Sequence, residues 1–303
     1  MSERYGSVKA SEDRNVKLGI DSYCFHRFFG EIDDGQSVPA QPMSVDDFLA
    51  YASELGVQGV SLESCFLPSM EEAWFRNLKA KLDDYGFERV YAWGHPSGLE
   101  DGSNREAFDD MMSQIRNAAL IGASVMRVTP GPGPTNWRET DRKPRMAILA
   151  GWYSEAVQVA QSLGVKLAAE NHGDYTSDEM LWLVEAVGSP CFGVTFDTGN
   201  FLRVMDEPVR AMKNLAPHTL ATHLKDVAPR DGASPADGYY LASTVLGEGR
   251  VDVPAVVRML KDAHYDGLLA VEIDYLHPRY GADEHAAVRR SIQYLRSVVA
   301  GMS

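Results

Sequence analysis

Four side chains of types that bind divalent metals stand at the ends of four consecutive apolar runs in the second half of the chain: Glu170, Asp197, His223 and Glu272. Three carboxylates and one imidazole suit Mn²⁺, Mg²⁺, Co²⁺, Fe²⁺ or Zn²⁺ and leave coordination positions open for substrate oxygens. Without a cation, three carboxylates in one pocket would repel one another or take up protons. Each residue alone is more often a helix cap or a salt-bridge partner, but four in register predict one metal site, with Mn²⁺ as the preferred ion.

His172 is the second residue of interest because it follows Glu170 by two positions. The two-residue period of a strand puts both side chains on the same side. Here an imidazole would bind substrate or act as a base beside the metal. The alternative is a hydrogen bond that only holds a ligand in place.

Further polar residues follow the first and third apolar runs. His26 and Arg27 lie in Tyr23-Cys-Phe-His-Arg-Phe-Phe, where the aromatic rings could stack on a sugar or an aromatic aglycone while His26 or Arg27 binds a hydroxyl. The alternative is an aromatic plug at the mouth of a barrel. His95 follows Trp93 and would either line the same pocket or be solvated in a loop.

Charged residues inside or just after apolar runs need partners. Arg127 lies within the fourth run, where an unpaired charge would be costly, so we expect it to pair with Glu63 or with a ligand carboxylate. Lys225 or the adjacent Asp226 is expected to neutralise or orient the site, and Asp274 points the same way as Glu272.

The elements that must position these residues are short apolar runs that alternate with amphipathic segments. Their β-branched and aromatic content over four to eight residues is typical of strands buried on both faces. The expected strands are Lys17–Cys24, Val57–Glu63, Glu88–Gly94, Ser124–Pro130, Val165–Asn171, Phe192–Asp197, Thr219–Lys225 and Gly267–Asp274.

The intervening segments carry helix signals. Ser44 is expected to cap the helix that includes Phe48–Leu55, and Ser177 is expected to start the helix that includes Met180–Val187. Longer helical patterns cover Asn104–Ile121, Arg145–Leu163, Val253–His264 and Ala286–Val299, and glycines expected to end helices before strands are Gly56, Gly86, Gly122, Gly164 and Gly267.

Eight βα units without a break in composition predict a single (β/α)8 TIM barrel over residues 16–303, after a loose N-terminal arm at residues 1–15. An open doubly wound sheet is the alternative, but no Gly-x-Gly-x-x-Gly follows the first strand. In a barrel of this kind the chemistry lies at the carboxyl ends of the strands, where the four metal-capable residues stand.

Composition restricts the classes of function. The chain has 303 residues, with 29 Lys and Arg against 43 Asp and Glu, and a formal net charge of −14. An acidic surface of this kind repels phosphate backbones, so no nucleic-acid partner is expected. Three widely spaced cysteines, interpreted as small buried side chains, point to a reducing compartment. The absence of a signal peptide or an apolar span predicts a cytoplasmic protein without a membrane partner.

Several motifs resemble one known family: Glu170-Asn-His-Gly, Asp197-Thr-Gly-Asn, His223-Leu-Lys-Asp, Leu246-Gly-Glu-Gly and Val271-Glu272. From Lys17 to about Ala300 the chain is similar to the xylose-isomerase-like sugar phosphate isomerase/epimerase superfamily. The resemblance implies a (β/α)8 barrel with a metal site of Glu170, Asp197, His223 and Glu272. In the ketose 3-epimerases of this superfamily, the first and last glutamates exchange a proton beside a carbonyl, which makes Glu170 and Glu272 candidate catalytic residues.

The chain departs from those epimerases at two candidate substrate-binding positions. Asn200 stands where they place a His, and Arg230, behind Pro229, is the nearest match to an Arg that they carry after the metal His. A free-ketose epimerase is therefore disfavoured. His172 instead resembles a residue of the α subunit of bacterial C-glycoside deglycosidases, lyases that eliminate the aglycone from a 3-keto sugar and work with a small β subunit.

Together these features predict a divalent-metal enzyme that removes a proton beside the carbonyl of a sugar or keto-sugar derivative. Return of the proton would give isomerisation or epimerisation, and loss of a leaving group would give a lyase. A non-catalytic sugar-binding barrel is the alternative from another class. The expected partner is a small sugar or glycoside substrate, with a homo-oligomer or a small accessory subunit as further possibilities. Cleavage of abasic DNA conflicts with the acidic charge.

Overall fold

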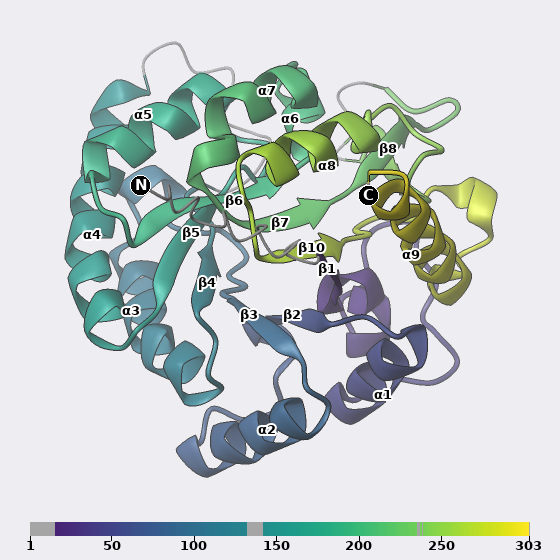
Figure 1. Cartoon of the computed structure of the whole chain (residues 1–303), viewed down its shortest axis with the longest axis horizontal. Helices are drawn as coiled ribbons and strands as arrows, with labels where there is room; N and C mark the ends of the chain where they lie inside the picture. The colour runs from purple at the N-terminus through teal and green to yellow at the C-terminus, as the bar shows by residue number, and fades with distance from the viewer. Residues whose placement is uncertain (1–15, 132–141, 235–236, 238, 303) are drawn as a thin grey trace, which may run out of the picture.

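The computed structural model describes residues 16–131, 142–234, 237 and 239–302. The predicted N-terminal arm at residues 1–15 lies outside the described residues. Figure 1 shows strands at the centre of the molecule with helices arranged around them.

The predicted (β/α)8 barrel is confirmed. Its strands close in the order β1-β10-β7-β6-β5-β4-β3-β2, and every neighbouring pair is parallel. The barrel strands are β1 (Lys17–Asp21), β2 (Gly59–Glu63), β3 (Glu88–Ala92), β4 (Val125–Val128), β5 (Lys166–Glu170), β6 (Phe192–Asp197), β7 (Thr219–Leu224) and β10 (Leu268–Val271).

Helices follow most of the strands and cover the outside of the barrel (Figure 1). The α-helices are α1 (Val45–Leu55), α2 (Glu72–Asp84), α3 (Arg105–Leu120), α4 (Lys143–Ser162), α5 (Ser177–Val187), α6 (Asn200–Arg203), α7 (Pro208–Leu215), α8 (Val253–Asp262) and α9 (Glu284–Ala300). Short 3-10 helices are η1 (Ser22–Phe29), η2 (Ser64–Phe66), η3 (Glu100–Gly102), η4 (Ala216–His218) and η5 (Pro278–Tyr280).

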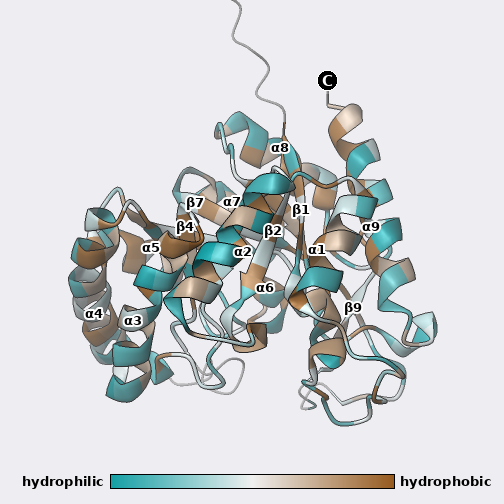
Figure 2. Ribbon diagram, turned by 90° about the horizontal axis from the view of Figure 1, so that it is seen from below, coloured by the Kyte–Doolittle hydropathy of each residue, from teal (hydrophilic) through white to brown (hydrophobic). Residues whose placement is uncertain are grey.

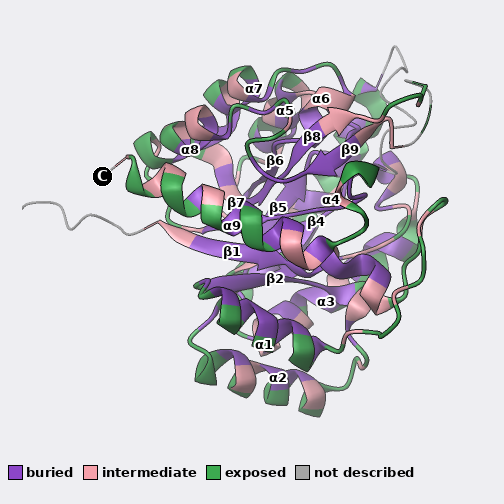
Figure 3. Ribbon diagram, turned by 90° about the vertical axis from the view of Figure 1, so that its right-hand side faces the viewer, coloured by how far each residue is buried: buried purple, intermediate pink, exposed green. Residues whose placement is uncertain are grey.

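Burial explains why the strands read as nearly continuous apolar runs. All residues of β2, β6 and β10 are buried, as expected for parallel strands packed on both faces. Figure 3 shows the strands buried and the helices exposed along their outer faces. In Figure 2 the helices alternate between hydrophilic and hydrophobic residues, which is the pattern of amphipathic helices that bury one side against a sheet.

The helix signals were mostly correct. Ser44 caps α1 and forms a capping box with Asp47. α5 begins at Ser177, as predicted, and its cap is the preceding residue Thr176, whose box partner is Glu179. Four of the five glycines have positive φ, but Gly267 does not: the residue with left-handed backbone after α8 is His264, with φ 59°.

Six barrel strands end earlier than predicted, namely β1, β3, β4, β5, β7 and β10, and the difference is largest, at three residues, for β1 and β10. β1 stops at Asp21, because the Asp21 side chain accepts a hydrogen bond from Tyr23 N at 2.6 Å and starts η1. β10 stops at Val271, so Glu272 and Asp274 lie beyond the strand end. β8 (Asp226–Pro229) and β9 (Leu241–Thr244) form an antiparallel hairpin that was not predicted from the sequence. The hairpin follows the carboxyl end of β7.

The expectation of three buried cysteines is met fully only by Cys24. All three are free, and Cys24 is buried, but Cys65 is exposed and Cys191 is intermediate. The prediction of a small buried side chain was therefore wrong for Cys65, which follows the end of β2 in η2. Within the described residues, no helix combines the length and the apolarity needed to cross a membrane.

Candidate metal centre

Four strand ends bring the predicted metal-capable residues together. Glu170 ends β5, Asp197 ends β6, His223 lies in β7 and Glu272 directly follows β10. These strands are consecutive neighbours in the barrel, and Asp197 is in register with His223. One ligand atom from each of the four side chains lies within 4.8 Å of every other, and all four are buried. The predicted convergence is confirmed.

The two ring nitrogens of His223 face different partners. Nδ1 lies 3.3 Å from Glu170 Oε1 and 3.4 Å from Glu272 Oε2, so it points into the cluster. Nε2 lies 3.4 Å from Oδ2 of Asp21, at the end of β1. A carboxylate behind a ligating histidine fixes the orientation of the ring. Asp21 was not among the residues predicted from the sequence. It could have been predicted, because it is a carboxylate near the end of the first apolar run.

Arg127 connects a ligand to a second acid, as expected from its place inside β4. Its Nε lies 2.6 Å from Glu170 Oε2 and its Nη2 lies 2.8 Å from Glu63 Oε1. All three side chains are at least nine-tenths buried. The guanidinium therefore compensates two buried carboxylates at once, which confirms the predicted structural pairing.

Lys225 lies on another flank of the cluster. Its Nζ is 2.8 Å from Glu272 Oε2, 3.0 Å from Asp197 Oδ2 and 3.1 Å from Asp274 Oδ2. Asp274 is in turn contacted by Arg203 Nη2 at 3.0 Å and accepts from the Ser243 hydroxyl. The expectation that Lys225 or Asp226 neutralises the site is confirmed for Lys225.

Asp226 has a different role, because its carboxylate accepts backbone hydrogen bonds from the loop that carries Leu246-Gly-Glu-Gly. The donors Gly247 N, Gly249 N and Val251 N lie at 2.9, 2.8 and 2.9 Å. A Cβ on Gly249 would come within 2.2 Å of Asp226 Oδ1, so the close approach requires glycine at that position. The Leu246-Gly-Glu-Gly motif therefore belongs to a loop whose backbone N–H groups bind the buried carboxylate of Asp226.

Asn171 and Asn200 hold Asp197 in place. Asn171 exchanges two hydrogen bonds with the backbone of Asp197, at 2.9 and 3.0 Å. Oδ1 of Asp197 accepts from Gly199 N at 2.8 Å and Asn200 N at 2.9 Å, which leaves Oδ2 facing the cluster. The Asn200 amide also lies 3.5 Å from Glu170 Oε1, so this candidate substrate-binding residue adjoins the metal-capable quartet.

The donor set fits a divalent cation. Glu170 Oε2, Asp197 Oδ2 and Glu272 Oε2 are buried, and the charged groups that face them are Arg127 and Lys225, at 2.6 to 3.0 Å. A carboxylate oxygen has more than one lone pair, so each of these oxygens can also bind a cation. Three carboxylates with one imidazole favour the first-row divalent ions and Mg²⁺.

The charges in the cluster shift its pKa values in opposite directions. Burial disfavours ionisation of Glu170, but the charges of Arg127 and His223 outweigh it and lower its pKa to about 2. Burial, helped by repulsion from Glu272 and Glu170, raises the pKa of Asp197 to about 8. Burial would lower the pKa of His223, yet Glu272 and Glu170 raise it well above its usual range. A cation that binds here would therefore release protons.

His172 lies beside this cluster with an exposed side chain. Its backbone N donates to Asp174 Oδ1 at 2.9 Å. Desolvation lowers the pKa of His172. The negative charge of Glu170 raises it, whereas the positive charges of Arg127 and Lys225 lower it further. The imidazole is therefore neutral at neutral pH, as a general base must be.

His26 and Arg27 lie in η1 and contact protein groups. The His26 ring nitrogens lie 2.8 Å from Glu31 O and 2.9 Å from Asp274 O. Arg27 is buried and donates to both carboxylate oxygens of Glu284, at 2.6 and 2.7 Å. The structure does not bring either into contact with the four metal-capable residues, and their role toward a substrate remains a prediction.

His95 and Arg230 lie on different loops. The His95 ring stacks on Trp93 with centroids 5.3 Å apart, and its Nδ1 accepts from Ser97 N at 3.3 Å. Arg230 follows β8, donates from Nε to Tyr239 O at 2.6 Å and lies 5.0 Å from the ring centroid of Tyr275. Substrate binding by these two residues is likewise a prediction.

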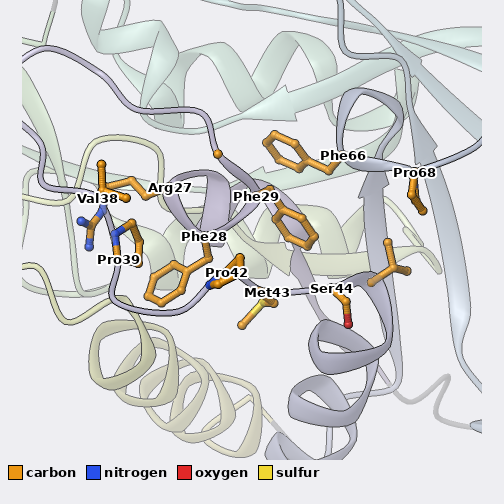
Figure 4. A pocket seen from close by; sticks show the side chains of 12 residues that line it. Arg27, Phe28, Phe29, Val38, Pro39, Pro42, Met43, Ser44, Phe66 and Pro68 are labelled. Carbon is orange, nitrogen blue, oxygen red and sulfur yellow. The ribbon is translucent and has the colours of Figure 1, made fainter.

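Two of the aromatic residues after β1, Phe28 and Phe29, line a separate groove of about 390 Å³ (Figure 4). Phe66, which follows β2, and Pro39, Met43 and Pro68 also form part of its wall. None of the four metal-capable residues lines this groove.

Comparison with known protein families gives one match over most of the chain. The family model described as a xylose isomerase-like TIM barrel matches residues 49–298. Among curated relatives, an inosose dehydratase of Klebsiella pneumoniae is 26% identical over 220 residues, which cover 65% of this chain and 73% of the relative. An uncharacterized protein of Methanocaldococcus jannaschii is 24% identical over 189 residues, which cover 59% of this chain and 60% of that protein.

Solved structures share the fold at lower identity. A crystal structure of the IOLI protein with a binding zinc atom superposes with a TM-score of 0.72 at 13% identity and covers 94% of this chain and 99% of that one. A D-psicose 3-epimerase solved in the presence of D-fructose gives a TM-score of 0.71 at 17% identity and covers 94% of this chain and 99% of its own.

Proposed function

Since this chain belongs to the xylose isomerase-like TIM barrel family, we propose that it is a divalent-metal-dependent enzyme that removes a proton beside the carbonyl group of a sugar or keto-sugar derivative. The observation that carries the proposal is the convergence of Glu170, Asp197, His223 and Glu272 within 4.8 Å at the carboxyl ends of their strands. That end is where barrels of this kind hold their active sites.

The four residues would hold one ion, with His223 ligating through Nδ1, which faces the carboxylates. When bound, such an ion supplies Lewis acidity that makes the C–H bond beside a carbonyl easier to break. Asp21 keeps the His223 ring oriented from behind, and Arg127 keeps Glu170 ionised. These contacts preorganise the ligands before substrate arrives.

His172 is the base that the surroundings favour. Glu170 and Glu272 are tied in ion pairs to Arg127 and Lys225, whereas the His172 imidazole is exposed. A neutral ring beside the ligand set takes up the proton at a ring nitrogen and returns it to the substrate carbon or to a leaving group. The amide of Asn200 lies near Glu170, and in this proposal it donates a hydrogen bond to a substrate oxygen.

The reaction outcome depends on where the electrons go after proton removal. Return of the proton gives an isomer or an epimer, and departure of a β-leaving group gives an unsaturated ketone. The curated relatives named inosose dehydratase favour elimination of water as the second candidate function. A lyase that acts on 3-keto-glycosides would catalyse the same type of elimination, with the aglycone instead of water as the leaving group.

A substrate screen in D2O tests the proposal. Free ketoses, keto-inositols and 3-keto-glycosides would be incubated with Mn²⁺-loaded protein, and the products followed by NMR. We expect deuterium at the carbon beside the carbonyl, or a conjugated ketone that absorbs in the ultraviolet, and loss of both on chelation. A substrate that turns over fully in chelated protein would remove the metal from the proposal. A ligand that binds without exchange would support a non-catalytic barrel instead.

A further inference from the structure

Lys225 places a buried positive charge directly beside the candidate metal centre. The residue is 2% exposed, and its Nζ lies between 2.8 and 3.1 Å from one oxygen each of Glu272, Asp197 and Asp274. Three carboxylates around one small cation, away from water, form the kind of oxygen-rich environment that a divalent metal also requires. The environment of this ammonium is therefore that of a cation site.

The ammonium shares ligands with the metal-capable quartet but does not lie at its centre. Asp197 and Glu272 belong to both groups of acids. Among the ion pairs of the described residues, Lys225 has none with Glu170, and the third acid on its side is Asp274. Asp274 is fixed there by Arg203 and Ser243. Two adjacent cation positions thus share two carboxylates.

That arrangement is the one found in dinuclear metal sites, where carboxylates hold two ions about 3.5–4 Å apart. We propose that Lys225 occupies the position of a second cation and thereby restricts the centre to a single divalent ion. The inference rests on the proposed function in one respect, namely that the quartet binds a metal. Lys225 is a positioning residue here, because its ammonium contacts ligands.

The difference between an ammonium and a metal ion decides the consequence. Lysine adds a single charge and cannot coordinate a substrate oxygen, whereas a second divalent ion would offer open coordination positions. A centre with one ion and one ammonium therefore exposes the substrate to one Lewis acid only.

Counting bound Mn²⁺ per chain tests the inference without any turnover measurement. Purified, chelated and reloaded protein would be analysed by elemental analysis, titration calorimetry and electron paramagnetic resonance. We expect one Mn²⁺ in the wild type and in K225R, which keeps the charge. We expect two in K225A, with a spin-coupled spectrum, and a return to one in K225A/D274N, which weakens the third carboxylate. K166A, which removes an exposed lysine at the opposite end of β5, is the matched control with one ion.

Several results would overturn the inference. The first is two bound ions in the wild type. The second is a single bound ion in K225A, with unchanged or higher affinity. A higher affinity for one ion would mean that Lys225 competes with the metal for the same position. If K225A does not fold, K225Q, which is neutral and offers an amide oxygen, carries the same expectation of two. A wild-type protein that binds no Mn²⁺ would instead contradict the proposed function itself.

Discussion

The carboxylate of Asp21, at the end of β1, faces Nε2 of His223, in β7, at 3.4 Å across the intervening strand β10. Because the other ring nitrogen of His223 points at Glu170 and Glu272, the imidazole is held between a supporting acid and the ligand cluster. Asp21 thus sets the orientation of the ring of His223, and its removal should change the affinity for metal.

Replacement of Asp21 by Asn should weaken metal binding without unfolding the protein. D21N keeps an oxygen that can accept from Tyr23 N, the bond that starts η1, but removes the charge behind His223. We expect the Kd for Mn²⁺ to rise about 10- to 100-fold, the usual effect of losing such a partner, in a calorimetric titration. D283N, which alters the cap of α9 in the same way, should leave the Kd unchanged. Equal affinities for D21N and wild type would contradict the proposed support.

Removal of Arg127 should strongly destabilise the barrel. R127M leaves Glu63 and Glu170 buried without their shared cation, and breaking a buried pair by removing one partner costs about 3–5 kcal/mol. The loss would be measured as the free energy of unfolding in urea, with metal removed. E63Q/R127M should recover part of it, because one uncompensated carboxylate has become neutral. A loss below about 1 kcal/mol in R127M would show that the guanidinium is dispensable.

His172 should determine the acid limb of the pH–rate profile. The base must be neutral to accept a proton, so kcat/KM should fall as the pH drops through the pKa of His172, which desolvation sets below its ordinary value of 6.5. H172Q should reduce turnover by about 10²- to 10⁴-fold and abolish that limb, while it still binds one Mn²⁺ per chain. A variant with an unchanged profile would transfer the role of base to Glu170 or Glu272.

Asp174 should make stability depend on pH near neutrality. Burial, with repulsion from Asp101, raises its pKa from 3.8 to about 7, so between these values the folded protein holds a proton that the unfolded chain has lost. Stability that Asp174 contributes at low pH is therefore lost as the pH rises toward 7, by at most about 1.4 kcal/mol per pH unit.

D174N removes this titration while keeping an oxygen that can accept from His172 N. Urea unfolding from pH 5 to pH 8 should therefore show a smaller decline for D174N than for the wild type. Parallel curves for the two proteins would mean that Asp174 ionises at its ordinary pKa in the folded state.

The sequence by itself determined the barrel and its four metal-capable residues. Buried parallel strands leave apolar runs that are visible locally, and β6 matched its predicted bounds at Phe192–Asp197. Because barrel topology puts all carboxyl ends at one rim, polar residues at those ends had to meet, as Glu170, Asp197, His223 and Glu272 do. The (β/α)8 architecture could therefore be predicted without knowing which side chains contact one another.

The sequence indicated Arg127 and either Lys225 or Asp226 as charges near the site, but only the tertiary structure decided between Lys225 and Asp226 and added Asp21. Asp21, Arg127 and Lys225 belong to three different βα units, and their contacts depend on barrel register and on the directions that long side chains take. The ends of β1 and β10 and the hairpin β8–β9 depend in the same way on hydrogen bonds between distant segments. Local periodicity identifies a strand and its buried faces, but the charges that surround a ligand are set by chain segments far apart in sequence.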